Sequence, residues 1–271
     1  QDQLFVVTDP PHRDVDHQTV AGILGLDVQA LRLKIGFPAP EVLAATDPGP
    51  AHELADQLLD TGLNVRVFGG DRLADLPWSR VASEYAFGEA GLTMELGEGT
   101  VALSYDTPVT AVYWKPPPDF SAPVPPPAAV SVLSGADLAE ALQFQAGVDL
   151  FYREGADVRR ASIVRSVSDC VHPEEHRSVS PTERLELAVA EIARRFDGAV
   201  VDTRLENVRP RRRFAMGDES FDVDLRKMFS YGTLLLRQAL MAAAPELGDL
   251  PQYELGSRVA YVLNRARQNE A

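Results

Sequence analysis

The chain has 271 residues, of which 45% are hydrophobic and 24% charged, and its formal net charge is −14. The length suits one large domain or two modest ones, and the apolar share excludes wholesale disorder. The excess of acidic over basic residues argues against nonspecific binding of nucleic acid or of an anionic membrane by the whole chain, because like charges repel. The single cysteine excludes an internal disulfide and a cysteine metal cage.

No apolar run reaches the roughly 18 residues that cross a bilayer, so we expect a soluble, cytoplasmic protein without membrane insertion. Because the sequence begins with Gln1 rather than Met, the alternative is that a signal peptide has been removed.

The first 70 residues predict a small α+β module with the element order β-α-α-β-α-β. Short apolar runs predict its three strands, at residues 4–7, 41–45 and 64–68. Asp16 and Asp27 precede helical patterns as N-caps, and Gly25 and Gly62 stand where helices end. Two helices are therefore expected between the first two strands, and one between the second and the third.

Residues 4–68 resemble the fold shared by the C-terminal domain of the bacterial ribosomal stalk protein and the adaptor of the Clp protease. The segments that carry the resemblance are residues 30–31, 40–43 and 51–65. The resemblance implies a fold that mostly binds other proteins. The lysine-rich helix of the stalk domain has no counterpart, because only Arg32 and Lys34 are basic in this region. No histidine matches the one in the helix of the Clp adaptor.

Beyond Trp78 apolar residues recur at every second position, which predicts an antiparallel β-meander. Its four strands are expected at residues 84–87, 92–96, 100–105 and 109–114. The meander would complete a first domain over residues 1–115. The proline-rich segment 116–127 predicts a linker, and the alternative is a semi-rigid strap across one compact body.

Residues 128–271 predict a second, arginine-rich α+β module that ends in helices. A helix, a β-hairpin, a helix, a strand and two final helices are expected at residues 137–145, 148–164, 180–196, 199–201, 229–243 and 254–267. The second of these helices begins with a capping-box pattern, Ser-Pro-Thr-Glu. Net charge is −10 over residues 1–115 and −4 over residues 116–271, which indicates two different surfaces.

One polar cluster is a candidate metal site. It consists of Asp169, Cys170, His172, Glu174, Glu175 and His176. Thiolate and imidazole groups suit Zn²⁺ or Fe²⁺, but Pro173 disfavours the regular helix that would align the two histidines. A Cys170–His172 nucleophile pair would need a third group from elsewhere. The alternative is a solvated surface loop.

A second cluster follows the strand predicted near residue 201. It consists of Arg204, Arg209, Arg211, Arg212 and Arg213. Guanidinium groups bind phosphate or carboxylate in a bidentate manner, and Tyr231 is a candidate for stacking on a ligand. Nearby acidic residues, among them Asp202 and Glu206, suggest the alternative that the arginines are paired within the chain.

No P-loop, dinucleotide-binding fingerprint or nucleophile elbow occurs in the sequence. Asp149, Glu154 and Asp157 resemble the carboxylates of metal-dependent nucleases, but no lysine accompanies them. We therefore expect a non-enzymatic protein-binding protein, an adaptor or an assembly subunit, without a cofactor. The alternatives are a phosphate- or nucleic-acid-binding protein that uses residues 209–213, and a metalloenzyme at Cys170, His172 and His176.

Overall fold

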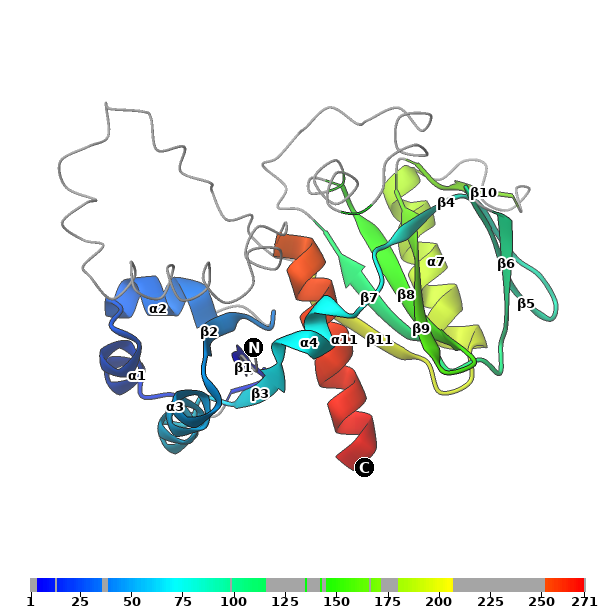
Figure 1. Cartoon of the computed structure of the whole chain (residues 1–271). Helices are drawn as coiled ribbons and strands as arrows, with labels where there is room; N and C mark the ends of the chain where they lie inside the picture. The colour runs from blue at the N-terminus through cyan, green and yellow to red at the C-terminus, as the bar shows by residue number, and fades with distance from the viewer. Residues whose placement is uncertain are drawn as a thin grey trace. The chain divides into compact units, whose positions relative to one another are not determined.

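The structure, a computed structural model, describes residues 4–12, 14–35, 39–97, 99–115, 135, 142, 145–165, 167–171, 180–206 and 252–270. It divides into two compact units between Asp75 and Leu76. Unit 1 denotes the described residues up to Asp75, and unit 2 the described residues from Leu76 onward (Figure 1). No helix in these ranges is both long and apolar enough to span a bilayer.

Unit 1 combines a three-stranded antiparallel sheet with four helices in its described part. Its elements in chain order are β1 (Leu4–Thr8), α1 (His17–Leu24), α2 (Val28–Ile35), β2 (Val42–Thr46), α3 (Pro48–Asp60), β3 (Val65–Gly69) and α4 (Gly70–Ala74). The strand order is β2-β1-β3, and both neighbours run antiparallel to β1. The predicted β-α-α-β-α-β order is confirmed, and α4 follows β3 directly.

The helix boundaries of unit 1 follow from aspartate caps and from glycine. The Asp16 carboxylate accepts the N–H groups of Gln18 and Thr19 at 3.1 Å, and Asp27 caps α2 in the same way. Gly25 ends α1 in the left-handed region, at φ 62°. The apolar helix faces pack on a core that includes Val6, Val20, Leu31, Leu43 and Leu58.

Unit 2 is built on an eight-stranded mixed sheet. Its elements are β4 (Arg80–Phe87), β5 (Gly91–Leu96), β6 (Gly99–Ser104), β7 (Thr110–Trp114), β8 (Gly147–Glu154), β9 (Asp157–Val164), β10 (Asp169–Cys170), α7 (Pro181–Arg195), β11 (Val200–Leu205) and α11 (Gln252–Glu270). The strand order is β11-β7-β8-β9-β4-β5-β6, and β10 pairs with β4. Together the two units confirm the α+β class.

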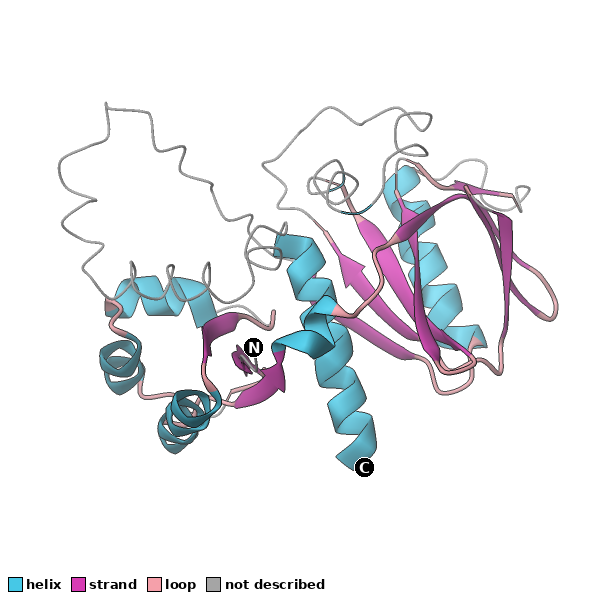
Figure 2. Cartoon of the chain, viewed as in Figure 1, coloured by secondary structure: helices cyan, strands magenta, loops and turns pink. Residues whose placement is uncertain are grey.

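The central strands of unit 2 are buried on both faces. Val148 and Leu150 of β8 share a core with the apolar side of α7, whereas Phe151 stacks on Tyr261 of α11, with ring centroids 4.4 Å apart. This alternation follows from the period of two in a strand. Figure 2 shows α7 between strands β8 and β9 on one side and strands β5 and β6 on the other. The sheet therefore has a helix against each face.

The sheet joins strands from both sides of the proline-rich segment 116–127. β7 pairs antiparallel with β8 and parallel with β11, and it is no neighbour of β6. The predicted meander is thus correct for β4–β6 and wrong for its fourth strand. All five residues of β7 are buried, as is typical of a central strand. The predicted boundary between residues 1–115 and 128–271 is corrected accordingly, because the division falls after residue 75.

Other predicted elements of the C-terminal half are confirmed where they are described. The hairpin is β8–β9, the final helix is α11, and α7 begins with a capping box in which Ser180 Oγ accepts the Glu183 N–H at 3.3 Å. The segment 116–127, most of the predicted helix 137–145 and the predicted helix 229–243 lie outside the described residues.

Gly147 begins β8 beside a buried indole ring. A Cβ atom at this position would lie 2.4 Å from Trp114 Cζ2 and 3.0 Å from the carbonyl oxygen of Ile163. Because Trp114 is 1% exposed, its ring has little room to move. We expect Gly147→Ala to lower the free energy of unfolding by about 1–3 kcal/mol through overpacking, measured by urea denaturation. Gly88→Ala is the control, since its Cβ would lie 3.5 Å from the nearest atom, and equal effects of the two substitutions would contradict this account.

Candidate functional site

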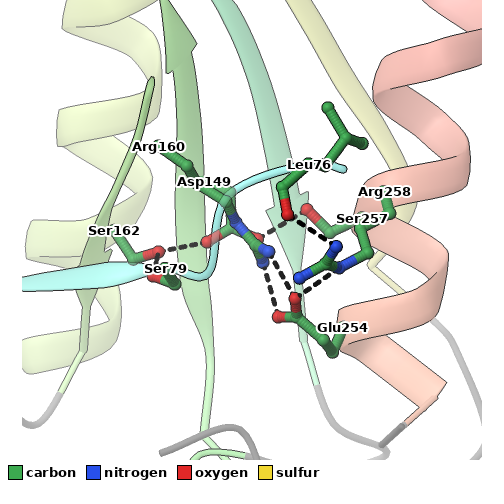
Figure 3. A network of polar contacts seen from close by, with 8 residues as sticks. All are labelled: Leu76, Ser79, Asp149, Arg160, Ser162, Glu254, Ser257 and Arg258. Carbon is green, nitrogen blue, oxygen red and sulfur yellow. Dashed lines mark hydrogen bonds and ion pairs between the residues drawn. The ribbon is translucent and has the colours of Figure 1, made fainter. Parts of the chain in front are cut away.

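The most prominent polar network of the described residues lies inside unit 2, between the sheet and α11 (Figure 3). Four of its side chains carry charge: Asp149 on β8, Arg160 on β9, and Glu254 and Arg258 on α11. None of the four is more than 2% exposed. Two guanidinium groups and two carboxylates balance each other, so the network has no net charge when all four are ionised.

Arg160 joins the two carboxylates. Its Nη2 donates to Asp149 Oδ2 at 2.7 Å and to Glu254 Oε2 at 2.8 Å, and its Nη1 donates to Glu254 Oε1 at 2.5 Å. The contact with Glu254 is bidentate, which fixes the relative orientation of the two side chains. Burial lowers the pKa of Arg160, but the charges of Asp149 and Glu254 outweigh this effect and raise it above its usual range. Arg160 therefore stays charged at any pH at which the protein folds.

Serine hydroxyls complete the hydrogen bonding of Asp149. Ser257 donates to Asp149 Oδ2 at 2.6 Å, and Ser162 donates to Asp149 Oδ1. The Ser162 hydroxyl also contacts that of Ser79, in the segment before β4. Both oxygens of Asp149 are thus occupied by side chains of unit 2.

Arg258 extends the network to the start of unit 2. Its Nε donates to Glu254 Oε1 at 2.8 Å, and its Nη1 donates to the carbonyl oxygen of Leu76 at 2.7 Å. The guanidinium carbon lies 4.8 Å from the ring centroid of Trp78, within the range of a cation–π contact. The described contacts of these carboxylates are therefore internal, and the geometry suits holding α11 on the sheet rather than binding a substrate.

Arg204 is the one member of the predicted arginine cluster that the structure describes. Its Nε donates to both oxygens of Asp202, at 2.9 and 3.0 Å, and Asn264 of α11 donates to Asp202 at 2.8 Å. Burial raises the pKa of Asp202, but the hydrogen bonds and charge of Arg204 outweigh it and lower the pKa below its usual value. For Arg204, the alternative of pairing within the chain is therefore confirmed.

The other predicted binding residues lie outside the described part of the chain. They are Arg209, Arg211, Arg212, Arg213 and Tyr231, and the same holds for His172 and His176. Cys170 is half-buried on β10, in register with Tyr85 of β4. Within the described ranges, no group of three His, Cys, Asp or Glu residues is arranged to hold a metal ion.

The three carboxylates that resembled a nuclease site do not come together. Asp149 is buried in the network, whereas Glu154 and Asp157 are exposed at the tip of the β8–β9 hairpin. There they pair with Arg159, at 2.9 and 3.6 Å. Glu154 is five positions after Asp149 on β8, and side chains an odd number of positions apart point to opposite faces of a sheet. The strand therefore keeps these two carboxylates apart.

The open edge of the sheet is a different kind of candidate site. β6 ends the strand order and pairs with no described strand other than β5. The Tyr105 N–H donates to the carbonyl oxygen of Ala90, the residue before β5. Because the backbone groups of successive residues in a strand point to opposite sides, the N–H and C=O groups of Thr100, Ala102 and Ser104 point away from β5. The side chains of these three residues are exposed, whereas Leu103 is buried. Within the described part of the chain, the outer edge of β6 is thus a strand edge without a partner strand.

Sequence reasoning missed the network although a signal for it exists. Asp149 stands between Val148 and Leu150 in an otherwise apolar segment, at a position where a core residue belongs. Charged residues are almost never fully buried unless they are paired, so this interruption indicates a buried ion pair that includes Asp149. The partners of Asp149 carry no such signal, because Arg160 follows the exposed Arg159 and α11 is distant along the chain.

Comparisons with known proteins give no relative: no family model, no curated protein and no solved structure matches the chain. The resemblance of residues 4–68 to the ribosomal stalk domain and the Clp adaptor therefore stays a prediction.

The first test of the network removes its central cation. Arg160→Met leaves Asp149 and Glu254 as buried charges without full compensation, and we expect the free energy of unfolding to fall by about 3–5 kcal/mol. Arg159→Met is the matched control, because the neighbouring Arg159 is in an exposed ion pair worth about 0–1 kcal/mol. Urea denaturation followed by tryptophan fluorescence reports on unit 2, which contains both tryptophans. Similar losses in the two variants would refute the assigned role of Arg160.

A second test concerns the pH dependence of the Asp202–Arg204 pair. A carboxyl group whose pKa is lowered by folding stabilises the protein above its unfolded pKa, and this contribution is lost as the pH falls through the folded value. We expect Asp202→Asn to cost about 2 kcal/mol at neutral pH, and the cost to shrink below the ordinary carboxyl pKa of 3.8. Denaturation of both proteins over a pH series measures this difference, and Asp157→Asn at an exposed pair is the control. A cost that grows towards acid pH would contradict the assignment.

Proposed function

We propose that the chain is a non-enzymatic protein-binding protein, an adaptor or an assembly subunit, and that unit 2 takes an extended segment of its partner as an additional strand beside β6. The observation that carries the proposal is the outer edge of β6, which pairs with no described strand and contains no charged residue. An extended segment added to a sheet edge gains backbone hydrogen bonds from its whole length.

The residues of β6 lack the devices that normally protect an edge. Natural edge strands carry lysine, proline, a bulge or an inward-pointing charge, which prevent pairing with another chain. Gly99–Ser104 contains none of these residues, and its register with β5 is regular over six pairs. Such an edge is tolerated at a surface where pairing is useful.

The interior of unit 2 supports the same reading. Its buried carboxylates bind arginine and serine side chains of the same unit, so they serve packing.

The exposed charges of unit 1 also support a protein-binding function. The outer side of α3 exposes Glu53, Asp56 and Asp60 around Leu59, which is 47% exposed. Residues 1–75 contain twelve acidic and five basic residues. These features favour partners of basic character.

The test is a substitution that blocks the edge alone. Ala102→Pro removes an N–H group that points away from β5 and places a ring on the free edge, whereas Ala102→Val keeps the N–H group. After affinity purification of the tagged protein from its own cells, the recovered partner is purified and its Kd measured with each variant. We expect Ala102→Pro to weaken binding at least about tenfold, or 1.4 kcal/mol, and Ala102→Val to leave it nearly unchanged.

Unchanged far-ultraviolet circular dichroism would show that both variants fold. A partner that binds the proline variant as tightly as the original chain would overturn the use of β6. Recovery of the bare monomer at low salt would count against a protein-binding function altogether.

A further inference from the structure

The solvent-facing side of the sheet beside β6 carries a row of carboxylates. Asp169 of β10 is in register with Glu84 of β4, and Glu84 is in register with Glu95 of β5. Glu95 is in turn opposite Thr100 of β6. Glu84, Glu95 and Thr100 are exposed, so they line one face across three adjacent strands.

Glu84 and Glu95 are directly opposite each other on β4 and β5. Like charges directly opposite on neighbouring strands destabilise a sheet. Among the described residues, no arginine, lysine or histidine forms an ion pair with either of them. Arg184 reaches Asp169, at 3.9 Å, and the side chain of Asp169 is 81% exposed. The face therefore holds an unfavourable charge pair that a bound cation would relieve.

The carboxylate of Glu95 leans toward the open edge. Thr100 Oγ1 donates to Glu95 Oε1 at 2.7 Å and to Oε2 at 2.9 Å, which holds both oxygens beside β6. A strand added to the edge would lie about 4.8 Å beyond β6, the usual spacing of strands. A long basic side chain on the solvent-facing side of that strand, opposite Thr100, spans this distance.

We propose that the segment bound beside β6 is basic, with an arginine or lysine opposite Thr100 that pairs with Glu95 and offsets its repulsion with Glu84. This inference rests on the proposed function, since it needs strand addition at β6. Pairing of β6 with β6 of a second copy does not supply this cation, because Gly99–Ser104 contains no charged residue.

The test uses two capped synthetic peptides as probes, Val-Thr-Val-Arg-Val-Thr-Val and the same peptide with Gln in place of Arg. Their alternation directs valine toward the α7 side and the central residue toward the carboxylates. Fluorescence anisotropy with labelled peptides measures both affinities. We expect the arginine peptide to bind about threefold to fivefold more tightly than the glutamine peptide, and the preference to weaken with salt.

Glu95→Gln should abolish this preference, because the amide still accepts from Thr100 but carries no charge. The matched control Glu89→Gln removes an exposed carboxylate from the β4–β5 turn and should keep the preference. Ala102→Pro should prevent both peptides from binding. Hydrogen exchange should show that the arginine peptide protects the amides of Thr100, Ala102 and Ser104.

The outcomes separate this inference from the proposed function. If Ala102→Pro blocks binding but Glu95→Gln leaves the preference intact, the basic partner is refuted and strand addition stands. If Ala102→Pro changes nothing, strand addition at β6 fails as well. Failure of both peptides to bind, or a concentration-dependent dimer that Ala102→Pro dissociates in sedimentation, would overturn the basic segment as the occupant.

Discussion

Arg160 connects parts of unit 2 that are distant in the sequence. From β9 it contacts Asp149 on the neighbouring strand and Glu254 on the C-terminal helix, all without exposure to water. A charge buried in this way is tolerated only while its partners are in place, because the desolvation of each group is large. The position of α11 on the sheet is therefore tied to this bidentate contact and to the hydrogen bonds of Ser257 with Asp149 and of Asn264 with Asp202. The ring contacts of Phe151 with Tyr261 and of Trp114 with Tyr253 act beside them.

The burial of β7 explains why unit 2 does not end at the proline-rich segment 116–127. β7 needs a strand on each edge and a helix on each face, because all five of its residues are buried. β8 and β11 provide the edges, and α7 and α11 cover the faces. The residues that complete this environment come from both sides of segment 116–127, so no cut at that segment leaves a finished core.

Local elements could be predicted from the sequence because their causes are local. Asp16, Asp27 and Ser180 satisfy the first N–H groups of their own helices, and the hairpin of β8 and β9 is joined by a tight turn. Strand order could not be predicted, since the continuous apolar run of β7 suits pairing with β6 or with β8 equally well. The site was harder still: the partners Asp149 and Glu254 are 105 residues apart, and nothing within either segment specifies the other.

The treatment of charge differs between the inside and the outside of this sheet. Inside, each carboxylate of the network has an arginine within hydrogen-bonding distance, and the sum of charges is zero. Outside, Glu84 and Glu95 are opposite each other with no described cation, next to a strand edge that pairs with no described strand. Repulsion in water is weak enough for the fold to tolerate it, since solvent screens exposed charges. A basic side chain that reached over this face from a strand added beside β6 would exclude part of that water and strengthen the attraction. The feature that slightly destabilises the free protein is therefore the one that favours a bound segment.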